Sequence, residues 1–162
     1  AGIVLARSGA HWSREEWHIP KERMKKKRPH IVPLSRQAMT ILKELQKLTG
    51  DKMHVFYSSR SKSRHISNGV VLMAMRRMGY QGRMTGHGYR SLASTILNEK
   101  GYSPDVIERQ LAHADDDKIR SAYNRAEYLL ERKKMMQDYA DILDAMKNKT
   151  AGDVIFIQKR KR

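Results

Sequence analysis

The 162-residue chain contains no cysteine, and this absence excludes three kinds of chemistry at once. Without cysteine there is no disulfide framework, no thiolate nucleophile and no cysteine-based zinc site. The sequence also lacks a long uninterrupted apolar run and a lipidation motif, which disfavours a membrane as its partner. No signal-peptide pattern is visible, so a cytoplasmic location is expected.

Basic residues dominate what is present. The chain has 33 Lys and Arg against 17 Asp and Glu, a net charge of +16, and its pI is near 10.2. This excess predicts a polyanionic partner, although a basic domain whose charge only keeps it in solution stays an alternative. The length, with 40% apolar residues, suits one domain with a sizeable core.

Two short strands around a basic turn are predicted near the N-terminus. Residues 17–20 and 30–34 are rich in bulky and β-branched side chains, with prolines that fit strand ends. The turn between them carries six cations: Lys21, Arg23, Lys25, Lys26, Lys27 and Arg28. Further on, residues 58–64 are polar and basic, and we expect them to form a loop that contacts phosphates.

Helical periodicity predicts that most of the remaining chain is α-helix. The expected helices run from Ser35 to Gly50, from Ser67 to Gly79, over residues 89–100 and 103–113, around Tyr123, and then over a longer stretch. Their apolar positions are Ala38, Ile41, Leu42, Leu45, Leu48; Val70, Val71, Ala74, Met75, Met78; Leu92, Ala93, Ile96, Leu97; Val106, Ile107, Leu111; and Leu129, Met136, Tyr139, Leu143, Met146. With a last strand over 153–157, the fold class is α+β and mostly helical.

His87 and Arg90 form a candidate phosphate-binding pair. They stand three residues apart, so at a helix start both project from one face. The guanidinium fork fits two phosphate oxygens, and the flanking glycines allow close approach of the backbone. Taken alone this spacing is common, and a surface pair at a helix cap is the competing interpretation.

His113 and Tyr123 are a candidate second imidazole and a candidate nucleophile. Tyr123 lies between Arg120 and Arg125, and a phenol with a pKa of about 10 needs such a cationic site to react as phenolate. His113 could donate a hydrogen bond to a phosphate oxygen. The alternative for His113 is a structural histidine at a helix end. The alternative for Tyr123 is an ordinary core tyrosine, an interpretation that fits Tyr128 and Tyr139 better.

Lys25 is a candidate general acid. Cleavage of a phosphodiester leaves a 5′ oxygen that needs a proton, and a lysine at a hairpin tip can reach into a groove to supply it. Its neighbours Lys26 and Lys27 share the same setting. For each of these lysines a contact to the DNA backbone alone remains an alternative.

Together these motifs resemble the catalytic domain of the tyrosine recombinases, most closely the integrases of P4-like prophages and genomic islands. The resemblance extends over residues 17–144. The matching stretches are residues 19–25 with 29–35, His87-Gly88-Tyr89-Arg90, Leu111-Ala112-His113, and residues 122–128. It implies the fold of that domain for residues 1–150, followed by a strand and basic tail over 151–162.

The resemblance also implies a role for each site residue. Tyr123 would attack the scissile phosphate, form a 3′-phosphotyrosyl link and release a 5′ hydroxyl, while Lys25 would protonate the leaving oxygen. Arg90 would hold the non-bridging oxygens, His87 would assist proton transfer and His113 would complete the oxyanion site. No metal and no other cofactor is implied.

One departure from the family concerns its first catalytic arginine. Residues 1–6 resemble the remains of the helix that follows it, and neither Arg7 nor Arg14 is followed by the expected residues. We therefore expect this arginine just before Ala1, and we expect the 162-residue chain to bind DNA but to cleave it very poorly.

The implied partners are double-stranded attachment sites, a homotetramer on DNA, and accessory DNA-bending or excision-directing proteins, at the bacterial nucleoid. The family often passes a C-terminal segment to a neighbouring protomer, for which 154–157 is suitable.

Three alternatives stay open: a type IB topoisomerase, which relaxes DNA without a specific site; a decayed integrase; and a non-catalytic DNA-binding module that does not depend on Tyr123. A metal-dependent nuclease is disfavoured because the acids cluster in one turn, at residues 115–117.

Overall fold

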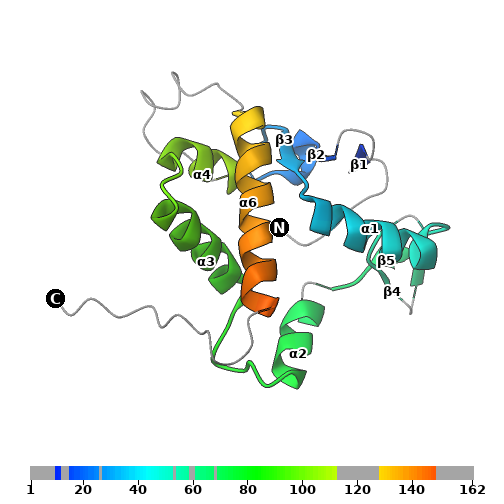
Figure 1. Cartoon of the computed structure of the whole chain (residues 1–162). Coiled ribbons are helices and arrows are strands. Elements are labelled where there is room, and N and C mark those ends of the chain that lie inside the picture. Colours follow the sequence, from blue (N-terminus) through cyan, green and yellow to red (C-terminus); the bar gives the residue numbers. More distant parts are fainter. Residues whose placement is uncertain are drawn as a thin grey trace.

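The computed structural model describes residues 10–11, 15–25, 27–52, 54–58, 61–67, 69–112 and 128–148. In Figure 1 the long helix α6 (Leu129–Asn148) stands at the centre of this part of the chain. On one side of it lie α3 (Gly86–Glu99) and α4 (Pro104–Gln110), and on the other the small sheet and α1 (Arg36–Thr49). The prediction of a mostly helical α+β fold is confirmed.

The predicted basic hairpin is present. Strands β1 (Ala10–His11), β2 (Glu16–Ile19) and β3 (His30–Pro33) form an antiparallel sheet in that order. In the β2–β3 register, Trp17 faces Val32 and Ile19 faces His30. A short 3-10 turn, η3 (Lys21–Arg23), leads from β2 into the basic turn. The sheet thereby presents the lysine-rich turn at one end, beyond Ile19 and His30.

The prediction of a loop over residues 58–64 is wrong. Strands β4 (Tyr57–Ser58) and β5 (Ser61–His65) pair antiparallel there, with Tyr57 opposite His65. The alternation of serine with lysine or arginine has no apolar face, so it lacks the usual sequence sign of a strand. Pairing through backbone N–H and C=O groups does not require that sign.

Helix boundaries follow their caps rather than the apolar pattern. Ser35 begins α1 as predicted, because its Oγ accepts a hydrogen bond from the Ala38 N–H at 3.3 Å. Thr85 caps α3 in the same way, from the Gly88 N–H at 3.1 Å, so α3 begins at Gly86 and not at residue 89. Helix α4 ends at Gln110, earlier than predicted, and is followed by Ala112 with a φ of 50°.

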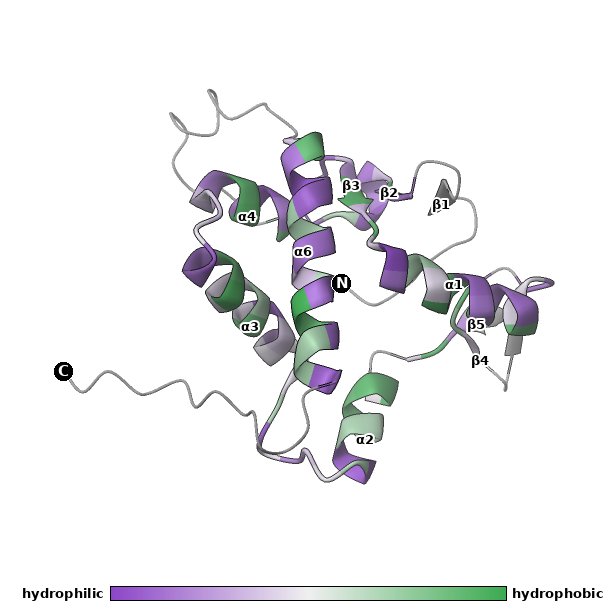
Figure 2. Cartoon of the chain, in the orientation of Figure 1, coloured by the Kyte–Doolittle hydropathy of each residue, from purple (hydrophilic) through white to green (hydrophobic). Residues whose placement is uncertain are grey.

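Two apolar clusters hold the fold together. The first joins α3, α4 and α6, and the second joins α1 to the segments around β3 and β4. The buried members of the first are Leu97, Val106, Ile107 and Met135, with Tyr102, Leu111, Tyr128, Met136 and Tyr139 packed against them. Those of the second are Leu42 and Val55, with Trp17, Leu34, Leu45 and Phe56 around them. Figure 2 shows the apolar stretches of α3 and α4 beside α6.

Several predicted core positions are wrong, because periodicity identifies an apolar face but not what covers it. Helix α2 (Gly69–Arg77) lies at the lower edge of the view in Figure 1 and buries Met75 alone among its described residues. Exposed instead are Ile41, Leu48 (74%), Val70, Ala74, Met78 (63%), Leu92, Leu143 and Met146. On α6 the buried side chains are Arg132 and Met135.

We predict that Met135→Ala lowers the free energy of unfolding by about 2–5 kcal/mol. The Met135 side chain is 0% exposed in the first cluster, so its truncation leaves a cavity. Urea unfolding followed by circular dichroism measures the change. Leu130→Ala, on the same helix at 84% exposure, is the matched control and should stay within about 0.5 kcal/mol of the parent chain. Equal losses in both variants contradict the placement of this core.

Candidate active site and nucleic-acid interface

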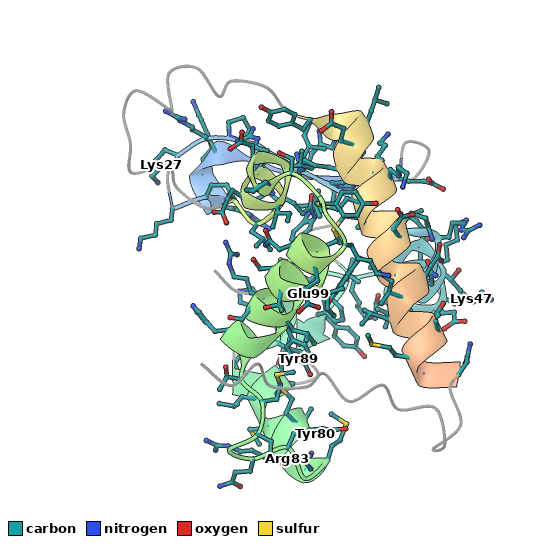
Figure 3. All side chains as sticks on the ribbon, turned by 60° about the vertical axis from the view of Figure 1, so that its left-hand side comes forward. Lys27, Lys47, Tyr80, Arg83, Tyr89 and Glu99 are labelled. Atoms are coloured by element: carbon teal, nitrogen blue, oxygen red, sulfur yellow. The ribbon has the colours of Figure 1, made fainter. Side chains whose placement is uncertain are left out.

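The hairpin turn presents exposed cations. Lys25, Lys27 and Arg28 are all exposed, and the Lys27 N–H donates to the Met24 carbonyl at 3.0 Å, which closes the turn. Figure 3 shows Lys27 projecting from the hairpin, while Lys47 lies on the other side of the molecule. Solvated cations at a protruding tip can approach DNA phosphates without moving the fold.

The start of α3 holds His87 and Arg90, as predicted. His87 is exposed and Arg90 is half-buried. Both follow the Thr85 cap, so they lie at a helix N-terminus, where the backbone dipoles favour an anion. The Arg90 Nη2 donates a hydrogen bond to the Leu111 carbonyl. This bond brings the start of α3 beside the end of α4, two residues before His113.

Several predicted site residues lie outside the described residues. His113 and Tyr123 belong to the stretch 113–127, and Lys26 and Arg60 also fall outside. Lys62 and Arg64 lie on β5, where the backbone alone is described. The roles given to these residues therefore stay predictions. What the structure shows is how residues on either side of 113–127 are held in place.

Three positions before that stretch lies Gln110, the last residue of α4. Its carbonyl lies 3.3 Å from Nε2 of His30, at the start of β3. Its side-chain oxygen accepts a hydrogen bond from Nε of Arg132 at 2.9 Å. The end of α4 is thus held from two sides, by the hairpin and by α6.

The residue on the far side is Tyr128, and the anchor there is Arg132 in the first turn of α6. The Arg132 backbone N–H donates to the Tyr128 carbonyl at 2.8 Å, and its Nη2 donates to the Ile31 carbonyl of β3. Sequence reasoning missed Arg132. The available signal was a charged residue on the apolar stripe of α6, three positions after Leu129 and three before Met135.

A second polar link joins the hairpin to α6 through Glu16 of β2. This buried carboxylate accepts hydrogen bonds from Nζ of Lys133 at 2.8 Å and from Nε2 of His18 at 2.9 Å. The bond from Lys133, and then that from His18, holds the pKa of the Glu16 carboxyl below its usual value, against the opposing effect of burial.

This lowered pKa predicts a pH-dependent contribution to stability. A carboxyl whose pKa is lower in the folded state stabilises the fold above its unfolded pKa, and this stabilisation is lost as the pH falls through the folded value. Glu16→Gln should therefore lower the free energy of unfolding by about 1–3 kcal/mol at pH 7 and by much less near pH 3. Urea titrations at the two pH values measure it.

The exposed carboxylate Glu22, in η3, offers the control for that experiment. Glu22→Gln should leave the stability nearly unchanged at both pH values. A constant deficit for Glu16→Gln from pH 7 to pH 3 contradicts a role for the ionised carboxylate.

Other kinds of site find little support in the described part of the chain. Within it, no group of three or more His, Asp or Glu side chains is arranged to hold a metal ion. No helix of the described residues is long and apolar enough to cross a membrane.

Comparison with known proteins points in one direction. The phage integrase family matches residues 5–129. Over 130 residues the chain is 45% identical to prophage integrase IntA of Escherichia coli K12, covering 80% of this chain and 32% of that protein. It is 48% identical over 129 residues to prophage integrase IntZ of the same strain, covering 79% and 32%.

A third relative comes from a phage. The integrase of Enterobacteria phage P4 is 40% identical over 162 residues, covering 90% of this chain and 37% of that protein. The chain thus spans about a third of the length of these curated relatives. No solved structure matches the chain.

Proposed function

The chain belongs to the phage integrase family, and on this basis we propose that it is the catalytic part of a tyrosine recombinase. Such an enzyme integrates a prophage or genomic island by cutting and rejoining DNA at specific sites. Beside the family match, the structural observation that supports this is the bond from Arg90 to the Leu111 carbonyl. It joins two motifs that are 21 residues apart in the sequence, the HxxR pair and the segment leading to His113.

The chemistry begins with Tyr123. Its hydroxyl gives up its proton, with His87 assisting the transfer, and the phenolate oxygen attacks the scissile phosphorus. A phosphotyrosyl bond forms at the 3′ side as the bond to the 5′ oxygen breaks. Lys25 gives a proton to the departing 5′ oxygen. Because the phosphoester bond is exchanged and not hydrolysed, the reverse attack by a 5′ hydroxyl rejoins DNA without ATP.

Hydrogen-bond donors held in fixed positions stabilise the negative charge on the phosphate. Arg90 holds the non-bridging oxygens, His113 donates a further hydrogen bond, and His87 assists proton transfer. The bond to Leu111 does not compete with this role, because a guanidinium has five N–H donors and can hold a carbonyl and a phosphate at once. That bond instead orients the side chain before DNA arrives.

The remaining cations hold DNA without reading its sequence. Lys27 and Arg28 contact backbone phosphates from the hairpin, with Lys26, Arg60, Lys62 and Arg64 as further contacts. Residues 1–150 form the catalytic domain and 151–162 a strand and tail. The enzyme works as a homotetramer on attachment-site DNA with accessory DNA-bending or excision-directing proteins, at the bacterial nucleoid.

Covalent trapping on nicked attachment-site DNA tests the proposal. The 162-residue chain and a longer form with additional upstream residues are incubated with the nicked duplex and then denatured. We expect an adduct that survives denaturation with at least one of the two forms. DNA binding without any adduct contradicts the proposal and favours a decayed integrase or a non-catalytic binding module. Relaxation of DNA lacking an attachment site favours a topoisomerase.

A further inference from the structure

Arg132 is a fully buried arginine to which the reaction described above gives no role. Its side chain is 0% exposed. A guanidinium in such a position is costly unless its donors meet acceptors. Here Nε donates to Oε1 of Gln110 at 2.9 Å, and Nη2 donates to the carbonyl of Ile31.

These bonds connect three parts of the molecule at one point: β3, the last residue of α4, and the first turn of α6. Ile31 is paired with His18 across the β2–β3 hairpin. Through Ile31, Arg132 is therefore hydrogen-bonded to the hairpin whose turn carries Lys25. Gln110 is also held through its carbonyl by Nε2 of His30. The junction therefore links the hairpin to the two helix ends.

In the sequence, the two helix ends lie on either side of the stretch 113–127. Gln110 precedes His113 by three positions, and Arg132 follows Tyr123 by nine. We propose that Arg132 is a positioning residue for DNA cleavage, which holds Gln110 and the start of α6, described residues on either side of 113–127, against the hairpin that carries Lys25. This inference rests on the function proposed above.

The chemistry of the side chain suits this role. A planar guanidinium presents separate N–H groups in fixed directions and can bond to two elements at once, whereas an ammonium on a flexible stem is a single point of charge. A displacement of about 1 Å between reacting groups can lower a rate by about 100-fold. Loss of the link should therefore slow cleavage even in a molecule that remains folded and binds DNA.

The test uses the form that gives the stronger adduct, with three variants. Arg132→Lys keeps the charge but loses the planar guanidinium, and Gln110→Ala removes one of its acceptors. Leu42→Ala damages the second apolar cluster, to which neither Arg132 nor Gln110 belongs. Single-turnover cleavage of nicked DNA at saturating protein, DNA affinity and the melting temperature are measured for each.

We expect Arg132→Lys to slow cleavage about 100-fold and Gln110→Ala about 10-fold, both with nearly unchanged DNA affinity. Leu42→Ala should lower the melting temperature at least as much and still cleave within about 2-fold of the parent rate, below the melting transition. Gln110→Ala keeps the test decisive if Arg132→Lys does not fold.

A parent-like cleavage rate in Gln110→Ala and in folded Arg132→Lys overturns the positioning role, while the adduct formed by the parent still supports the recombinase. The positioning role is also overturned if, across all three variants, the loss of cleavage rate is proportional to the fall in melting temperature. Absence of an adduct from the parent protein overturns the proposed function itself, and this role with it.

Discussion

Tyr123→Phe is expected to abolish covalent cleavage of nicked attachment-site DNA, with a rate at least about 10⁴-fold below that of the parent protein. Phenylalanine keeps the ring but removes the oxygen that attacks phosphorus. DNA binding should persist, because affinity comes mainly from cations on the hairpin and elsewhere. Denaturing gels of the trapped complex measure the first quantity, and gel-shift titrations measure the second.

The neighbouring tyrosine Tyr128 provides a matched control. It is half-buried and packs against the cluster formed by α3, α4 and α6. Tyr128→Phe removes the same atom from a residue with a packing role and should keep most of the cleavage rate. Adduct formation by Tyr123→Phe, or its loss in Tyr128→Phe alone, contradicts the assignment of the nucleophile.

Lys25→Ala should slow cleavage about 10³-fold, because the departing 5′ oxygen then leaves without a proton from the general acid. A substrate with sulfur in place of that bridging oxygen should restore most of the rate. A thiol has a pKa of about 8.5, so a thiolate leaves readily without a proton. Single-turnover cleavage of the two substrates at saturating protein measures the rescue.

Lys27→Ala separates proton transfer from DNA binding. Lys27 is exposed on the same hairpin turn as Lys25 and is expected to contact a phosphate only. Its loss should weaken binding at all sequences and lower the slope of affinity against salt by about one, with little effect on cleavage at saturation. Failure of the sulfur substrate to rescue Lys25→Ala contradicts the role of general acid.

Local signals were sufficient to predict the hairpin and the beginning of α1. Ser35 has the side chain for a helix cap, and the bulky strands flank a turn too charged to be buried. The same kind of signal was available at Thr85. The prediction does not use that signal, so it starts α3 at residue 89, three residues too late.

What the sequence could not reveal depends on contacts between distant residues. Strand β5 is recognisable only by its pairing with β4, and the exposure of Met78 depends on what packs against α2. Arg132 is the clearest case. Its place on the apolar stripe of α6 marks it as unusual, but only the structure shows that β3 and the end of α4 supply its acceptors.

For the candidate site, the motifs predicted which residues to compare but not how they are held together. The bond from Arg90 to Leu111 links two of those motifs, and the contacts of Gln110 link a third, the hairpin. Lys25 and His87 are exposed, and Arg90 is half-buried. The roles of His113 and Tyr123 stay predictions that rest on their motifs and on the anchoring of 110–111 and 128–132.

The most direct test of the account identifies the atom that becomes attached to DNA. The trapped adduct is digested with trypsin and nuclease, and the peptide that keeps a nucleotide is sequenced by mass spectrometry. The account predicts a single modified residue, Tyr123, linked to a 3′ phosphate. A nucleotide on any other residue, or a link to a 5′ phosphate, contradicts it.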